Sequence, residues 1–184
     1  MSCESSESSV ALRGQSTGCE PAFEDHYMVL QDIGAGAFTQ VKLARHLLTG
    51  EEVTVKVLAK GASNFPFLSE GDTMVGLDHP NVIHLFQVME TKNYIYLIME
   101  HSGGGQWWDL IPETDGMQEE DSHRVFRQIL GAVQYCHQKG TMHLDLKPEN
   151  VVVDASGKAR LIDFGVNTRF TAGKKLKGFW GTTL

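Results

Sequence analysis

The stretch TMHLDLKPEN, residues 141–150, places an aspartate, a lysine and an asparagine close together in one apolar-flanked loop. Asp145 can accept a proton from an attacking hydroxyl, and Lys147 can neutralise charge on a phosphoryl group. Asn150 can hold a divalent cation through its amide oxygen. Phosphoryl transfer depends mainly on positioning and on charge stabilisation, so these side chains together are typical of that chemistry.

A second short stretch, IDFG at residues 162–165, follows this loop. Together the two stretches resemble the H-R-D-x-K-x-x-N catalytic loop and the D-F-G motif of protein kinases. The KPE sequence at 147–149 is similar to the serine/threonine type. The resemblance implies an α+β, protein-kinase-like fold, with a five-stranded antiparallel N-lobe and the first part of a helical C-lobe. It implies two catalytic residues, Asp145 and Lys147, and two Mg²⁺ ligands, Asn150 and Asp163.

A glycine-rich segment, GAGAFTQV at residues 34–41, lies between expected strands at 27–33 and 42–46. A dinucleotide-binding fold would have a helix after these glycines, so the strand that follows excludes that interpretation. The segment resembles the kinase G-x-G-x-x-G-x-V hairpin over the ATP phosphates, with Thr39 in place of the third glycine. Taken alone, it is equally consistent with an ordinary glycine-rich hairpin. The nucleotide-binding residues that the resemblance implies here are Ile33, Gly34, Ala35, Gly36 and Val41.

The third expected strand, 53–58, contains a VTVK run that ends at Lys56. This run resembles V-A-I-K, whose lysine contacts the α- and β-phosphates. Thr54 replaces the alanine above the adenine, so a polar group needs a partner there and we expect nucleotide affinity to fall. The ion-pair partner of Lys56 is expected to be Glu70 on the next helix. Glycines and a proline interrupt that helix, so we expect it to be short or mobile.

Two more expected strands, at 82–89 and 94–99, complete the sheet. By resemblance, Met99 lies at the back of the adenine pocket, although a role as core filler is compatible with this. Glu100 and His101 would form the hinge, whose backbone groups bind the adenine edge.

The second lobe is expected to be mostly helical, and the glycine run at 103–105 is expected to connect to it flexibly. Residues 121–139 predict a helix that supports the catalytic loop, because apolar residues recur at helical spacing. These apolar residues are Phe126, Ile129, Leu130 and Val133. The resemblance also implies a core column made of His143, Phe164, Met74 and Leu85.

Composition indicates a globular intracellular protein. The 184 residues are 41% apolar, and the net charge of −7 argues against nucleic acid or an anionic membrane as a partner. The sequence shows no apolar run of transmembrane length and no signal peptide. The odd number of cysteines, without a C-x-x-C pair, indicates reduced thiols and a cytoplasmic location. The expected domains are a disordered Ser/Glu/Gly-rich tail at 1–24, the N-lobe at 25–101 and the partial C-lobe at 102–184.

Two departures concern regulation. Leu144 replaces the arginine of H-R-D, and Gly178 stands where relatives carry a phosphorylated activation-loop threonine. We therefore hypothesise that phosphorylation at that site does not switch this protein on. By resemblance, the chain stops inside the activation segment at Leu184. We expect either a fragment of a longer protein or a truncated product, with a partner over the apolar underside of the C-lobe.

Two functions stay open on the sequence. The first is a serine/threonine protein kinase that uses ATP and Mg²⁺ and acts on a protein hydroxyl. The second is a nucleotide-binding or scaffolding pseudokinase, which Thr39, Thr54 and Leu144 favour together with the interrupted helix. Segments such as 25–27, 99–101 and 134–137 are similar to the sperm motility kinases, a branch near the microtubule-affinity-regulating and AMP-activated kinases.

Overall fold

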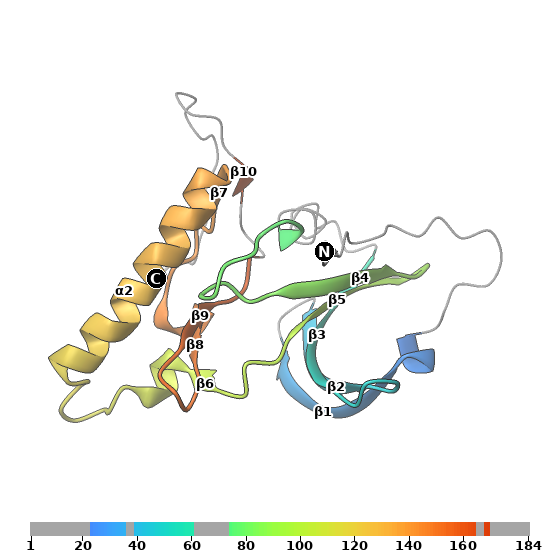
Figure 1. The fold of residues 1–184 in the computed structure, drawn as a ribbon. Helices are drawn as coiled ribbons and strands as arrows, with labels where there is room; N and C mark the ends of the chain where they lie inside the picture. Colours follow the sequence, from blue (N-terminus) through green and yellow to red (C-terminus); the bar gives the residue numbers. More distant parts are fainter. Residues whose placement is uncertain (1–22, 36–38, 61–73, 165–167, 170–184) are drawn as a thin grey trace, which may run out of the picture.

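The computed structural model describes residues 23–35, 39–60, 74–164 and 168–169. These residues form an antiparallel sheet and, beside it, a long helix packed on small strands (Figure 1). A short helix, η1 (Phe23–Asp25), precedes the sheet. Within the described ranges, no helix combines the length and the apolar content needed to cross a membrane.

The sheet has five antiparallel strands, which confirms the prediction from the sequence. In spatial order they are β1 (Tyr27–Ala35), β2 (Thr39–His46), β3 (Glu52–Ala59), β5 (Tyr94–Glu100) and β4 (Leu85–Glu90). β4 begins later than expected, because the backbone on either side of Val82 pairs with Leu161 in the second part of the molecule and not with β5. The Ile83 N–H donates to the Leu161 carbonyl oxygen, and the Leu161 N–H donates to that of Asn81. The sheet is therefore joined to the helical part just before β4.

One face of the sheet is packed in an apolar cluster, and the other carries Lys56. Alternate residues of β3 point to opposite sides, so Val53, Val55 and Val57 share one face. That face is closed by an apolar cluster with Ile98 and with Tyr27. The opposite face carries Thr54, Lys56 and Leu58, and it is the face from which Lys56 reaches the second part of the molecule.

The second part is built on α2 (Glu119–Gln138), which begins two residues before the predicted start. Its other elements are β6 (Gly105–Gln106), η2 (Trp107–Leu110), β7 (Thr141–Met142), η3 (Pro148–Asn150), β8 (Val151–Val153), β9 (Ala159–Leu161) and β10 (Thr168–Arg169). β8 pairs with β6 and β9, and β7 pairs with β10. One core cluster includes Met74 and Met99 together with Val125 and Phe164, so the core crosses the expected lobe boundary. The core-filling role expected for Met99 is confirmed.

The predicted apolar face of α2 is partly wrong. Ile129 and Val133 do pack against the core, but Phe126 is 60% exposed and Leu130 is 57% exposed. The buried residues of α2 are Val125, Ala132 and Cys136. Two neighbouring apolar stripes on α2 satisfy the same helical spacing, and contact with β9 and β7 decides which stripe is buried.

The glycine connector is held against the second part, contrary to the flexible link that we expected. Gly105 pairs with Val153, and the N–H of Gly104 donates to the Ser102 hydroxyl oxygen. A Cβ atom on Gly104 would lie 2.2 Å from the Val153 carbonyl oxygen. The close approach of two backbones therefore requires glycine at this position.

Gly104→Ala tests this packing. We expect the substitution to lower the free energy of unfolding by about 1–3 kcal/mol, because the added methyl group must displace the backbone of β8. Gly105→Ala is the matched control, because a Cβ there meets no atom within 4 Å. Urea unfolding of both variants measures the difference, and equal losses would show that the contact at Gly104 is not the constraint.

Candidate active site

An ion pair between Lys56 and Asp163 joins the two parts of the structure. Lys56 Nζ lies 2.8 Å from Asp163 Oδ1, across a separation of 107 residues. The Lys56 side chain is only 9% exposed, whereas that of Asp163 is 48% exposed. A buried ammonium group requires a compensating charge, and Asp163 supplies one on the face of the sheet that carries Lys56. Glu70, the expected partner of Lys56, lies outside the described residues.

The glycine hairpin runs directly beside Lys56. In the register of the sheet, Gly34 is opposite Val41, Val41 is opposite Lys56, and Lys56 is opposite Leu97. These four residues form one row across the sheet. Ile33 and Ala35 flank Gly34 on β1 and are exposed, while Gly36 falls outside the described residues.

The catalytic-loop residues contact one another. Lys147 Nζ lies 3.0 Å from Asp145 Oδ2, and Asn150 Nδ2 donates to the same oxygen over 3.1 Å. Asn150 Nδ2 also lies 2.9 Å from the Asp145 carbonyl oxygen. η3, which starts at Pro148, turns Asn150 back towards Asp145. The structure thus brings all three residues of the loop together around one carboxylate.

His143 connects this loop to the segment that carries Asp163. Its Nε2 lies 2.8 Å from the Ile162 carbonyl oxygen, and its Nδ1 accepts the N–H of Asp145 over 3.3 Å. Both contacts are satisfied by the neutral tautomer with a proton on Nε2. Burial lowers the pKa of His143 below its ordinary value, which agrees with that neutral form.

The expected core column is confirmed as a packing unit. The His143 and Phe164 rings meet edge to face, with centroids 4.7 Å apart. Phe164 and Met74 belong to the core cluster, and Leu85 packs against it. The loop with Asp145 and the segment with Asp163 therefore share one rigid support.

Backbone strain is found at the same place. Leu144 has a φ of 68° and Asp163 a φ of 59°, and these are the positive values at non-glycine positions in the described part of the chain. Left-handed backbone is unfavourable for a leucine, and such strain persists only where the surrounding structure imposes it. Leu144 directly precedes Asp145, and Asp163 directly precedes Phe164. Packing around His143 holds both in position.

The donor atoms fit a hard divalent cation. The Asn150 amide nitrogen is used by Asp145, which leaves the amide oxygen as a ligand, and Asp163 contributes a carboxylate. Mg²⁺ usually takes one or two protein oxygens and completes its coordination with water and phosphate oxygens. Among the described residues, no cluster of three or more His, Cys, Asp or Glu side chains could hold a metal ion.

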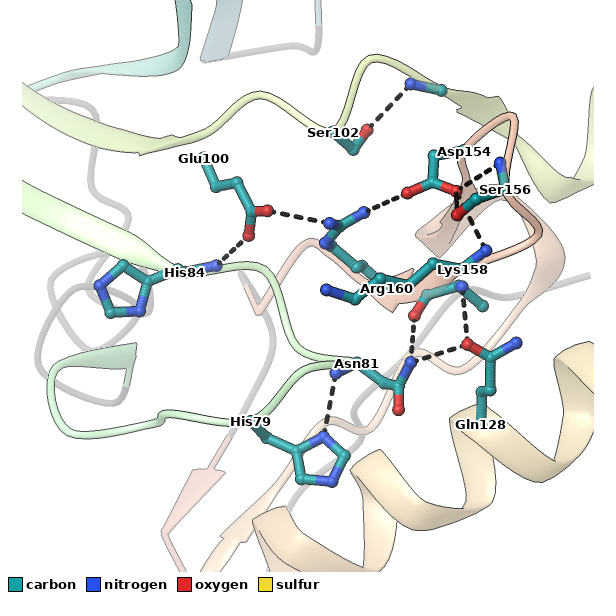
Figure 2. Close-up of polar contacts among 12 residues, drawn as sticks. His79, Asn81, His84, Glu100, Ser102, Gln128, Asp154, Ser156, Lys158 and Arg160 are labelled. Carbon is teal, nitrogen blue, oxygen red and sulfur yellow. Dashed lines mark hydrogen bonds and ion pairs between the residues drawn. The ribbon is translucent and has the colours of Figure 1, made fainter. Parts of the chain in front are cut away.

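A buried arginine, Arg160, holds the hinge through an ion pair with Glu100 (Figure 2). The sequence did not predict this contact. Arg160 lies 3.1 Å from Glu100 Oε1 and 3.2 Å from Asp154 Oδ2. The Glu100 side chain thus points to the second lobe. Hydrogen bonds, first that from the Ser156 hydroxyl, lower the pKa of Asp154 to about 2, so its carboxylate is charged. The only signal in the sequence is the Asp-x-Ser-Gly turn before Arg160.

A second polar contact fixes the same hairpin to the helix and to the loop before β4. Gln128 on α2 accepts hydrogen bonds from the side chain of Asn81 and from the N–H of Ala159. Asn81 Nδ2 also donates to the Ala159 carbonyl oxygen over 2.7 Å (Figure 2). Ion pairs and hydrogen bonds therefore connect the hinge, the hairpin of β8 and β9, and α2.

His143 makes stability depend on pH. Its folded-state pKa lies below the ordinary value of 6.5, so the unfolded chain binds a proton first as the pH falls. The contribution of His143 to the free energy of unfolding is therefore fully present above pH 6.5, and it decreases as the pH falls towards the folded-state pKa. Between about pH 7.5 and about pH 5.5, we expect a smaller decrease in Tm for His143→Gln than for the wild type.

The exposed His123 on α2 provides the control, since His123→Gln should keep the wild-type dependence. Thermal unfolding at several pH values measures all three proteins. A wild-type dependence retained in His143→Gln would contradict the assignment of a buried neutral imidazole.

Comparison with known proteins agrees with this geometry. The protein kinase domain family matches residues 27–184. Mouse sperm motility kinase 2B is 43% identical over 161 residues, which cover 87% of this chain and 33% of that protein. The mouse sperm motility kinase Tcr mutant form is 44% identical over 153 residues, 83% of this chain and 32% of that protein. The chain spans about a third of these relatives. It belongs to the protein kinase family and is related to the sperm motility kinases.

Proposed function

We propose that this chain carries the ATP site and the catalytic loop of a serine/threonine protein kinase. The observation that carries the proposal is the ion pair of Lys56 with Asp163, which joins the sheet to the segment that His143 connects to the loop of Asp145. In protein kinases a lysine on the sheet contacts the phosphates, and the carboxylate of the D-F-G motif binds the metal ion. Lys56 and Asp163 match these two residues, and the glycine hairpin lies in the same row as Lys56.

Each side chain has a separate role in this proposal. Asn150 and Asp163 would hold Mg²⁺, which offsets negative charge on the phosphates when it is bound with ATP. Lys56 binds phosphate oxygens from the sheet side. Asp145 accepts the proton of the acceptor hydroxyl, and Lys147 stabilises charge on the transferred group. The Asn150 amide holds the Asp145 carboxylate through the 3.1 Å contact.

The acceptor and the location in the cell are further parts of the proposal. The KPE sequence that begins at Lys147 supports a serine or threonine hydroxyl on a protein as the acceptor. The relatives carry the word kinase in their names, but this chain spans a third of their length, so the activity of the whole protein belongs to the proposal. The odd number of cysteines, without a C-x-x-C pair, supports a cytoplasmic location.

A second candidate, a nucleotide-binding protein with little transfer, is favoured by one specific observation. Leu144 stands in place of the arginine of the catalytic loop and has left-handed backbone next to Asp145. An apolar side chain there cannot receive a regulatory phosphate. Gly178 lies outside the described residues, so the hypothesis about activation stays a prediction.

Asp145→Asn separates the two candidates. We expect the substitution to lower phosphate transfer at least about 100-fold, because the acceptor hydroxyl loses its base, while ATP affinity stays within error. Transfer of labelled phosphate to a protein substrate and ATP-dependent thermal stabilisation are the two measurements.

Asp121→Asn is the matched control, because this carboxylate is exposed at the start of α2 and should not affect transfer. Wild-type transfer that persists in Asp145→Asn would contradict the proposed base. ATP-dependent stabilisation without any transfer in the wild type would favour the second candidate.

A further inference from the structure

A hydrogen bond joins the sheet to the hinge. Thr54 Oγ1 on β3 lies 3.1 Å from Nδ1 of His101, which follows the last residue of β5. Both residues are partly buried. The contact satisfies the hydroxyl group that the sequence led us to expect as an unpaired cost, so Thr54 need not weaken nucleotide binding.

The register of the sheet places this bond one row away from Lys56. Thr54 lies two residues before Lys56 on the same face of β3, a step of about 7 Å along the strand. In the row of Thr54, Leu43 lies on one side and Met99 on the other, and Met99 is followed by Leu85 on β4. From β2 to β4 this row is apolar except for Thr54, and on β1 it ends at the exposed Gln31. The row of Lys56 faces the carboxylate of Asp163 instead.

This order matches the two ends of a nucleotide. The charged row suits phosphates and a metal ion, and the apolar row with a single hydrogen-bonded polar pair suits a flat, partly polar base. The row proposed for the base is then the one next to the hinge. His101 follows Glu100, whose side chain is held from the other side by Arg160. The hinge is thus held at two consecutive residues by partners in two different elements.

We propose that Thr54 and His101 are a positioning pair for the nucleobase, an inference that rests on the proposed function. The hydrogen bond fixes the hinge in the orientation that receives the base before the ligand arrives. A binding site that is already ordered loses less entropy on binding, so the pair increases affinity for the whole nucleotide. It has no effect on phosphate binding, because the phosphates lie in the row of Lys56.

Thr54→Val tests the pair because it keeps the shape of the side chain and removes the hydroxyl group. We expect Mg-ATP affinity to fall about fivefold, the effect of one ordinary hydrogen bond. Affinity for magnesium tripolyphosphate, which has no base, should not change. Thr54→Ser retains the hydroxyl and should restore the wild-type affinity. In Thr54→Val/His101→Leu, the combined loss should be no larger than that of either substitution alone.

Isothermal titration of the full chain with both ligands distinguishes the outcomes. A wild type that binds neither Mg-ATP nor tripolyphosphate overturns the proposed function and the pair with it. A wild type that binds Mg-ATP, with equal or tighter binding by Thr54→Val, overturns only the pair. An equal loss of tripolyphosphate affinity in Thr54→Val overturns the pair as well, because the effect would then not act through the base.

Discussion

The ion pair between Lys56 and Asp163 is the constraint on which the rest of the site depends. It joins a buried ammonium group in the middle of the sheet to a more exposed carboxylate after β9. The charge of Lys56 would be costly without a partner, and Asp163 in the second part of the molecule supplies one. The segment of Asp163 is in turn fixed by His143, which bonds to Ile162 and packs against Phe164. A charge in the sheet thus depends on the aromatic packing beneath the catalytic loop.

Two opposite requirements meet in this arrangement. A binding cleft between two lobes must leave its charged groups accessible, yet the lobes must keep a fixed relation for those groups to meet. The contacts around Arg160 and Asn81 resolve this by joining the hinge, the hairpin and α2 (Figure 2). Gly104 allows the connector to pass directly against β8. The rigid contacts therefore connect the hinge to the second part of the molecule, and the strained residues Leu144 and Asp163 adjoin Asp145 and Phe164.

Much of the fold could be predicted because local patterns and tertiary structure agree. The five strands, the helix and the loop of Asp145 each follow from short stretches whose chemistry is local. The buried face of α2 could not be predicted, since Phe126 and Leu130 have the same spacing as residues that do pack. The burial of Arg160 could not be predicted, because arginine is rarely buried and only the two carboxylates around it permit this. The contact of Thr54 with His101 depends on strand register, which the sequence does not specify.

The dependence of ATP affinity on Mg²⁺ tests the central claim most directly. If one cleft holds phosphate at Lys56 and metal at Asp163, Mg²⁺ should raise the ATP affinity of the wild type. The effect should be lost in Asp163→Asn, which keeps the size of the side chain and removes its charge. Titration with ATP in the presence of Mg²⁺ or of a chelator gives both affinities. An equal Mg²⁺ dependence in the wild type and in Asp163→Asn would show that Asp163 does not face the nucleotide, and the account would be wrong.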